Sequence, residues 1–180
     1  LFKSRPDASH RFQVDRKLYV VNHFDYKKEY VSSVSSDSFP MRISDSLYVS
    51  PEFPKRMLEM IASDEIPLRD RRYRYSCLNF MLLKEMVECL AGEPMDVYLE
   101  REFYHPMGMG HTLYKPLERF PKEQVVPTIR QDYLRNKMKL QGFVHDEIAA
   151  FMGGVSGNAG LFSNARDVAK VYQMLIDGGM

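Results

Sequence analysis

The segment that most restricts how this chain can fold is RYRYSCLNFMLLKEMVECLAG, residues 72–92. Its apolar residues recur at helical spacing, Ser76 is a favourable N-cap residue, and Gly92 is typical of the position after a helix. These features predict a helix over about 76–91. Its expected buried face carries Leu78, Leu82, Leu83, Met86, Val87, Cys89 and Leu90. The opposite face carries Met81, Lys84, Glu85 and Glu88.

The residues just before this helix allow two interpretations. In the first, Ser76 caps the helix and the neighbouring tyrosines pack against it. In the second, Tyr75 stands at an active site. A basic cluster precedes Tyr75, and it consists of Arg69, Arg71, Arg72 and Arg74. Such a cluster is typical of a solvated loop, and it would also attract an anionic substrate.

Shorter periodic segments indicate further helices and a few strands. Helices are predicted over about 54–63, over about 95–104, and after Asn164, which is a favourable N-cap residue. The expected buried positions of the last two helices are Met95, Tyr98, Leu99 and Phe103, and then Val168, Val171, Tyr172 and Leu175. Short strands are predicted at 17–21 and 46–49. The pattern predicts a helix-rich α+β fold with few short strands.

Length and charge narrow the class of protein. A chain of 180 residues is expected to form one domain. Its residues are 44% hydrophobic and 27% charged, which is typical of a globular protein. The formal net charge of +1 gives no general attraction to nucleic acid or membranes. No apolar run approaches the ~18 residues that a membrane span needs.

Cysteine and histidine suggest no bound group. Cys77 and Cys89 would lie roughly 18 Å apart on one helix, too far for a disulfide. No His or Cys motif has metal-ligand spacing, so neither a metal nor another cofactor is expected.

The glycine-rich stretch GGVSGNAG, residues 153–160, has several interpretations. A phosphate-binding loop would need a lysine directly after the glycines, and a nucleophile elbow would need a different glycine spacing around Ser156. Two interpretations stay open. The stretch is either a tight turn before a short strand at 161–163, or a place where main chain approaches a ligand or another segment closely.

Two segments together resemble the serine β-lactamase and penicillin-binding-protein superfamily. The first carries its landmarks at Tyr75-Ser76, Leu82-Leu83, Ala91-Gly92, Tyr98-Leu99 and Pro106-Met107-Gly108-Met109. The second, VHDEIAAFMGGVSGNAGLFSNARDVAKVYQMLIDGG, is similar to the region that carries the superfamily's third motif in its His-x-Gly form. The resemblance covers about 65–180, and residues 1–64 look like the variable segment between the first and second motifs. It implies one partial β-lactamase/transpeptidase-like domain over residues 1–180.

The resemblance also implies a chemistry. In this superfamily a serine in Ser-x-x-Lys attacks a carbonyl, and the tyrosine of the second motif helps to move its proton. Tyr75 would take that catalytic role, with cations such as the arginine cluster lowering the pKa of its phenol. The substrate-binding positions would be Cys77, Asn158, Ala159 and Gly160, the last three on an edge strand.

The chain departs from the superfamily pattern in three ways. Cys77 stands where Asn or Asp is typical, and Asn158 stands where the third motif has a cationic or titratable residue. No serine is followed by a lysine three residues later, so the nucleophile motif is absent from these 180 residues. Superfamily order places that motif upstream of Leu1, so we expect an internal fragment that is inactive alone.

These observations favour a fragment of a serine hydrolase that acts by acyl transfer on an amide or ester. The expected substrate is a small molecule or a cell-wall peptide, and the expected partner is the remainder of the parent chain. The nearest resemblance is to domains fused to family 3 glycoside hydrolases (β-N-acetylhexosaminidases) in some bacteria, which implies a periplasmic or outer-surface location. Because of Cys77 and Asn158, a non-catalytic binding or structural module within such a fusion protein stays open.

Overall fold

The computed structural model describes residues 26–63, 73, 75–132, 134–135 and 139–179, and the backbone of 12–15 and 18–20. The structure is 43% helical and 14% strand, which confirms the predicted helix-rich α+β class. The basic cluster that the sequence places before Tyr75 lies outside the described residues.

The strands are short and form three small antiparallel sheets. β1 (Phe12–Asp15) pairs with β2 (Leu18–Val20), and β6 (Pro127–Ile129) pairs with β7 (Leu140–Gln141). The third sheet has the order β3-β5-β4, built from Val31–Ser32, Leu47–Val49 and Met41–Ser44. β2 and β5 confirm the two predicted strands.

The helices follow the predicted order along the chain. The α-helices are α1 (Glu52–Ser63), α2 (Cys77–Ala91), α3 (Met95–Leu99), α4 (Glu147–Phe151) and α5 (Ala165–Ile176). A π-helical turn, η2 (Glu100–Tyr104), continues α3. Two short 3₁₀ turns follow, η3 (Pro116–Glu118) and η4 (Lys122–Gln124).

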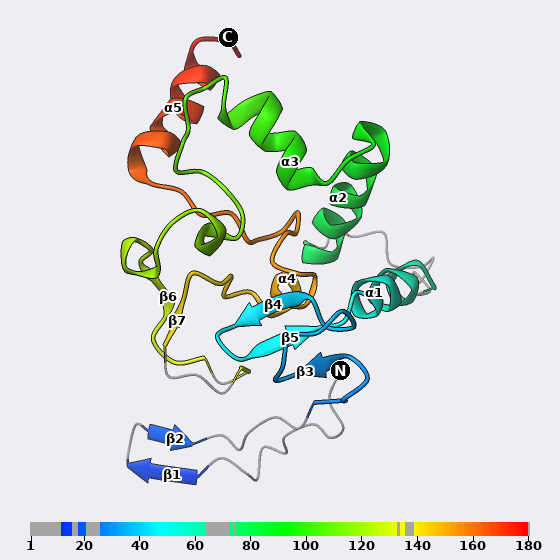
Figure 1. Cartoon of the computed structure of the whole chain (residues 1–180). Coiled ribbons are helices and arrows are strands. Elements are labelled where there is room, and N and C mark those ends of the chain that lie inside the picture. The colour runs from blue at the N-terminus through cyan, green and yellow to red at the C-terminus, as the bar shows by residue number, and fades with distance from the viewer. Residues whose placement is uncertain are drawn as a thin grey trace.

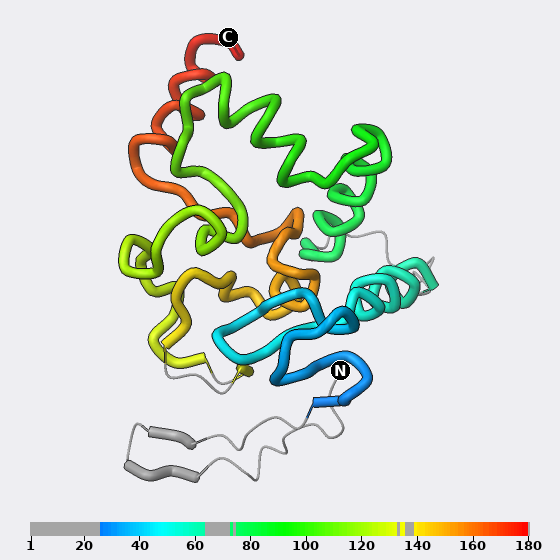
Figure 2. Tube along the Cα trace, viewed as in Figure 1, coloured from blue at the N-terminus to red at the C-terminus, as the bar shows by residue number. Residues whose placement is uncertain are grey.

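The last third of the chain joins the helical half of the molecule to the sheet half. Figure 1 shows α2, α3 and α5 on one side, the β3-β5-β4 sheet on the other, and α4 between them. In the tube of Figure 2, the yellow and orange segment runs between the green helices and the cyan sheet before it enters α5. This path brings the glycine-rich stretch next to α2.

The core lies where α4 meets the β3-β5-β4 sheet. Its buried residues are Val31, Ile43, Val49, Leu134, Val144, Ala149, Ala150 and Phe151. The Phe53 ring stands edge-on to both Tyr30 and Phe151, with ring centroids 5.6 Å apart in each pair. Arg135, which is 1% exposed, lies beside this core. It pairs with the Asp132 carboxylate and donates hydrogen bonds to the carbonyls of Val144 and His145. These contacts fix the segment that leads into the glycine-rich stretch.

Helix α2 has the predicted limits but presents the opposite face to the protein. Ser76 accepts a hydrogen bond from the Leu78 amide, and Gly92 ends the helix with a φ of 71°. The residue that α2 buries completely is Met81, whereas Leu83 is 50% exposed and Leu90 is 86% exposed. The predicted buried face is therefore wrong. Charged residues beside Met81 can face inward because they pair with one another, as described below.

The helix predicted at 95–104 changes its hydrogen-bonding pattern halfway. In η2 the His105 amide donates to the Glu100 carbonyl, five residues back. The wider turn accommodates an additional residue, so Tyr104 is half-buried while Phe103 is 43% exposed. Met95 is buried as predicted, and the prediction for Phe103 is wrong.

Helix α5 is capped by Asn164, whose side chain accepts a hydrogen bond from the Asp167 amide. The residue it buries is Asp167, which also accepts hydrogen bonds from the His111 amide and the Thr112 hydroxyl. The apolar stripe predicted to be buried is largely exposed, with Tyr172 at 64% and Leu175 at 62%. The helix is held at its first turn by polar contacts rather than along an apolar face.

Candidate active site

The glycine-rich stretch packs directly against the first turns of α2. A Cβ at Gly157 would overlap the carbonyl of Phe80 and would lie 3.4 Å from the Cβ of Lys84. Only glycine allows the two main chains to come this close. The Phe80 ring in turn contacts the ring of Tyr75, with centroids 5.8 Å apart. The contacts Tyr75–Phe80–Gly157 therefore join the head of α2 to the glycine-rich stretch.

Residues 155–160 form a turn that is held by its own side chains. The hydroxyl of Ser156, which is 1% exposed, donates a 2.6 Å hydrogen bond to the Asn158 side-chain oxygen. Gly160 has a φ of 113°, and a Cβ at this position would overlap the Gly154 carbonyl and stand 3.2 Å from the Tyr114 ring. Ala159 packs against the core. The expected edge strand at Asn158–Gly160 is wrong, because the positive φ of Gly160 bends the chain there.

The short strand expected at 161–163 is reduced to a single bridge. Phe162 and Leu113 exchange two backbone hydrogen bonds, of 2.9 and 3.0 Å. One residue later the hydroxyls of Thr112 and Ser163 lie 2.7 Å apart. This bridge carries the chain out of the turn and into α5.

Tyr75 is accessible, with 66% of its surface exposed. The Cys77 side chain raises the pKa of the Tyr75 phenol, through its negative charge when ionised and through a hydrogen bond. A phenol that acts as a base needs its pKa lowered. Within the described residues the shift has the opposite direction, and the arginines expected to lower it lie outside them.

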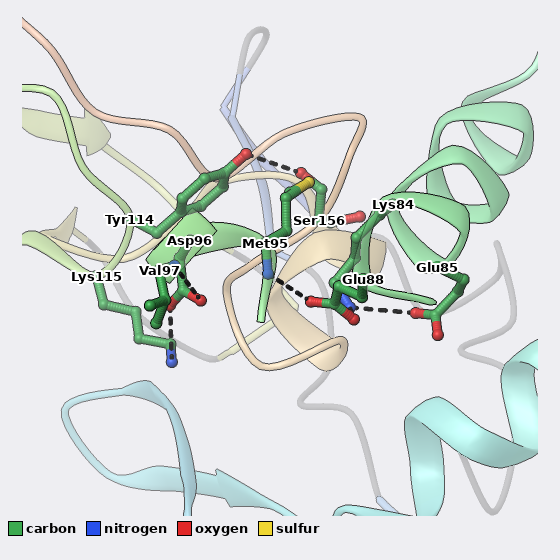
Figure 3. A network of polar contacts seen from close by, with 9 residues as sticks. All are labelled: Lys84, Glu85, Glu88, Met95, Asp96, Val97, Tyr114, Lys115 and Ser156. Carbon is green, nitrogen blue, oxygen red and sulfur yellow. Dashed lines mark hydrogen bonds and ion pairs between the residues drawn. The ribbon is translucent and has the colours of Figure 1, made fainter. Parts of the chain in front are cut away.

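A charged network occupies the inward face of α2 beside the turn (Figure 3). Lys84 contacts Glu88 at 2.5 Å and Glu85 at 3.1 Å. The second oxygen of Glu88 accepts a hydrogen bond from the Met95 amide at the start of α3. Burial alone would lower the pKa of Lys84, but its hydrogen bonds with the two glutamates raise it, so the ammonium stays charged. The network fixes the angle between α2 and α3.

A cavity of about 390 Å³ adjoins this network. Its walls come from β4, α2, the start of α3, residues 115–118 and 142–144, and the turn at 150–155. Its charged lining residues are Arg42, Lys84, Glu88, Asp96, Lys115 and Glu118. Tyr75 and residues 157–160 are not among the lining residues, so the cavity is separate from the contacts around Tyr75.

The structure thus gathers the predicted site residues in two neighbouring segments. Tyr75 and Cys77 lie at the head of α2, and Asn158, Ala159 and Gly160 lie in the turn that contacts it. The sequence analysis considered Ser156 only as the centre of a nucleophile elbow, placed Lys84 on the exposed face of its helix, and did not single out Tyr114. Tyr114 donates a 3.4 Å hydrogen bond to the Ser156 carbonyl. Lys84 and Glu88 had a visible signal, since residues four apart on a helix are neighbours.

Metal ligands and membrane spans are absent from the part of the chain that the structure describes. There, no three His, Cys, Asp or Glu side chains lie close enough together to hold a metal ion. None of the helices in these described segments is long and apolar enough to cross a bilayer.

Residues 32–179 match the family model of the beta-lactamases, and this chain therefore belongs to the beta-lactamase family. Its fold is that of the β-lactamase/transpeptidase-like serine hydrolases.

Two relatives are named as an amidase and as a putative carboxypeptidase. An N-acetylmuramyl-L-alanine amidase of Bacillus subtilis (strain 168) is 44% identical over an alignment of 119 residues, and the match covers 60% of this chain and 27% of that protein. A protein of Escherichia coli (strain K12) named "Putative D-alanyl-D-alanine carboxypeptidase" is 35% identical over an alignment of 170 residues, and the match covers 77% of this chain and 39% of that protein. The chain thus spans less than two fifths of the length of either relative.

Solved structures show the same fold. The D-amino acid amidase from Ochrobactrum anthropi SV3, complexed with L-phenylalanine, matches with a TM-score of 0.52 and 19% identity. The match covers 79% of this chain and 38% of that one.

Proposed function

We propose that this chain is part of a serine hydrolase that cleaves an amide bond by acyl transfer, with a cell-wall peptide as its substrate. The observation that carries the proposal is the contact of Gly157 with the Phe80 carbonyl. Because of this contact the turn at 155–160 lies beside the first turns of α2, and Tyr75 stands just before that helix. Family membership and the names of the two cell-wall relatives support the same reaction class. An ester is the alternative bond within this mechanism.

The proposed reaction uses a serine hydroxyl that the rest of the polypeptide supplies. That hydroxyl attacks the carbonyl carbon, its proton passes towards the Tyr75 oxygen, and the amine leaves after it is protonated. Water then hydrolyses the acyl-enzyme. In this scheme Cys77 and residues Asn158–Gly160 border the substrate. Because no Ser-x-x-Lys occurs in the 180 residues, the isolated chain is expected to be inactive.

Labelling with a fluorescent penicillin or a fluorophosphonate tests this proposal. The full-length protein should become labelled, and the 180-residue chain should not. Tyr75→Phe in the full-length protein should slow labelling by about 10²-fold or more, since general base catalysis contributes factors of that size. Tyr73→Phe is the matched control, because Tyr73 is 88% exposed and lies outside the proposed site. Labelling of the isolated chain, or equal labelling of both variants, would refute the proposal.

A non-catalytic module is the second candidate, and a specific observation favours it. Cys77 occupies the position of a hydrogen-bonding Asn or Asp and raises the pKa of Tyr75 rather than lowering it. In that case the activity of the parent protein would come from another domain, such as a fused β-N-acetylhexosaminidase. Tyr75→Phe would then leave every activity of the parent intact, which separates the two candidates.

The domain organisation and location belong to the same proposal. We infer one partial β-lactamase-like domain over residues 1–180, with the variable segment at 1–64. An extracytoplasmic location, periplasmic or on the outer surface, would fit the cell-wall names of the relatives.

A further inference from the structure

We infer that Ser156 is a positioning residue, which holds the side chain of Asn158 so that its amide nitrogen, and not its oxygen, is offered to the substrate. The turn at 155–160 then binds the substrate through a neutral hydrogen-bond donor. Its partner on the substrate is an oxygen acceptor that need not carry a charge. The inference rests on the proposed function, because it takes Asn158 as a residue that borders the substrate.

The Ser156 hydroxyl determines which end of the Asn158 amide is occupied. Ser156 is 1% exposed, and its hydroxyl oxygen lies 2.6 Å from the Asn158 Oδ1 atom. This distance is usual for an O–H···O hydrogen bond and is shorter than the roughly 2.7–3.2 Å of N–H···O bonds. The hydroxyl therefore donates to the amide oxygen. Turning the amide over would bring its nitrogen too close to the hydroxyl oxygen.

The amide nitrogen of Asn158 stays available for a ligand. Within the described residues every buried side-chain nitrogen or oxygen has a hydrogen-bond partner, whereas the Asn158 nitrogen has none there. This nitrogen is therefore accessible, although the residue as a whole is only partly exposed. A side-chain amide nitrogen carries two N–H donors. Both can pair with an oxygen of the substrate.

The backbone on either side of the Ser156 hydroxyl is held in place. The Tyr114 hydroxyl donates a 3.4 Å hydrogen bond to the Ser156 carbonyl (Figure 3). The next residue, Gly157, lies so close to α2 that a Cβ there would overlap the Phe80 carbonyl. Because its backbone is fixed in this way, Ser156 can restrict the orientation of the Asn158 side chain.

The lysines that approach the glycine-rich stretch within the described residues already face carboxylates. The Cβ of Lys84 would lie 3.4 Å from a Cβ at Gly157, and its ammonium group contacts two glutamates. The Cγ of Lys115 would lie 3.8 Å from a Cβ at Gly154, and its ammonium group stands 3.9 Å from Asp96. These carboxylates offset the positive charges. A carboxylate on the substrate would thus gain no free ion-pair partner from them.

Labelling kinetics of the full-length protein with a fluorescent penicillin, as the free acid and as its methyl ester, test the inference. The two rates should agree within about threefold, since a neutral donor makes no ion pair with the acid. Ser156→Ala should raise the probe concentration for half-maximal labelling about three- to tenfold, the effect of one hydrogen bond, without changing the maximal rate. Ser156→Thr keeps the hydroxyl and should retain most of the affinity. Asn158→Lys should favour the acid by about tenfold.

A double variant separates positioning of Asn158 from general support of the turn. If Ser156 acts through Asn158, Ser156→Ala should have no further effect in a protein that already carries Asn158→Ala. The melting temperature of each variant checks that it folds. Ser50→Ala is the matched control and should leave labelling unchanged. Ser50 is also buried, and its hydroxyl accepts a hydrogen bond from the Glu52 amide at the start of α1.

NMR of the full-length protein labelled with ¹⁵N-asparagine gives a measurement that does not depend on acylation. The heteronuclear NOE of the Asn158 side-chain nitrogen should be high, and it should fall in Ser156→Ala because the amide can then rotate. The inference is overturned if this NOE does not fall, if Ser156→Ala weakens labelling further in Asn158→Ala, or if the unmodified protein prefers the acid by more than about tenfold. Failure of the proposed acyl transfer would look different, because no labelling would occur while the NOE difference remained.

Discussion

Gly157 determines how closely the two halves of the candidate site can approach each other. The Phe80 carbonyl occupies the space where a Cβ would stand, and this atom belongs to the backbone of α2 and cannot rotate away. Gly157→Ala should therefore destabilise the protein by about 1–3 kcal/mol, the usual cost of overpacking a rigid contact. Urea unfolding measures the effect.

Gly110→Ala is the control for this substitution. A Cβ at Gly110 would meet nothing within 4 Å, and its φ is not positive. The alanine there should change the free energy of unfolding by less than about 0.5 kcal/mol. Equal effects of the two substitutions would show that the contact with Phe80 is not tight.

Several single residues could be assigned from the sequence because their role depends on neighbours in the chain. Ser76, Gly92 and Asn164 cap helices as predicted, since capping needs only local geometry. Lys115 has a left-handed backbone, with a φ of 47°, and this conformation had no such signal. A lysine followed by proline is not expected in the left-handed region.

At the scale of elements, α2 shows that the spacing of apolar residues predicts where a helix begins and ends more reliably than which of its faces is buried. Its apolar stripe is real, but the protein packs against Met81 and the Lys84–Glu88 pair instead. Buried charges are tolerated when each is paired, and pairing between α2 and the Met95 amide cannot be read from α2 alone. Likewise, the π-helical turn η2 contains one more residue than an α-helical turn, so Tyr104 is half-buried where the α-helical pattern predicted Phe103.

The network on α2 is open to a direct test. Glu88→Gln removes the charge that pairs with the half-buried Lys84, and it weakens the acceptor of the Met95 amide. We expect a loss of about 1–3 kcal/mol in the free energy of unfolding, as for other hydrogen bonds to partly buried charged groups. Glu52→Gln breaks the exposed pair with Lys55 and should cost less than about 0.5 kcal/mol. Similar losses in chemical denaturation of both variants would contradict this role.

At the scale of the whole molecule, apolar side chains of α2 and α5 remain in contact with solvent. The most exposed are Leu90 at 86%, Ile176 at 78%, Tyr172 at 64% and Leu175 at 62%. The sequence analysis placed α5 and most of the α2 stripe inside because amphipathic helices usually bury that face. Of the β3-β5-β4 sheet the sequence analysis predicted only β5, because the three strands combine through contacts that no local pattern specifies.

The tyrosines give the folded protein a characteristic response to alkaline pH. Burial raises the pKa of Tyr114 to about 12 and also raises those of Tyr26 and Tyr104. These groups are neutral in the folded state at a pH where the unfolded chain, with phenol pKa values of about 10, is already ionised. Their contribution to stability is therefore complete below about pH 10 and falls as the pH rises towards 12.

Urea unfolding between pH 9 and pH 11.5 measures this dependence. Tyr114→Phe should flatten the decline, because phenylalanine cannot ionise in either state. Tyr73→Phe should leave the slope unchanged, since Tyr73 is 88% exposed. A slope that is the same in all three proteins would contradict the assignment to buried phenols.

The π-helical turn at Glu100–Tyr104 has a consequence for how relatives are aligned with this chain. Such a turn is one additional residue inserted into an α-helix without disturbing the helix on either side. A homologue that continues as ordinary helix would thus be one residue shorter between Met95 and Met109. The gap belongs within 100–104, and the segments before and after it should superpose once the numbering after the gap is offset by that one residue.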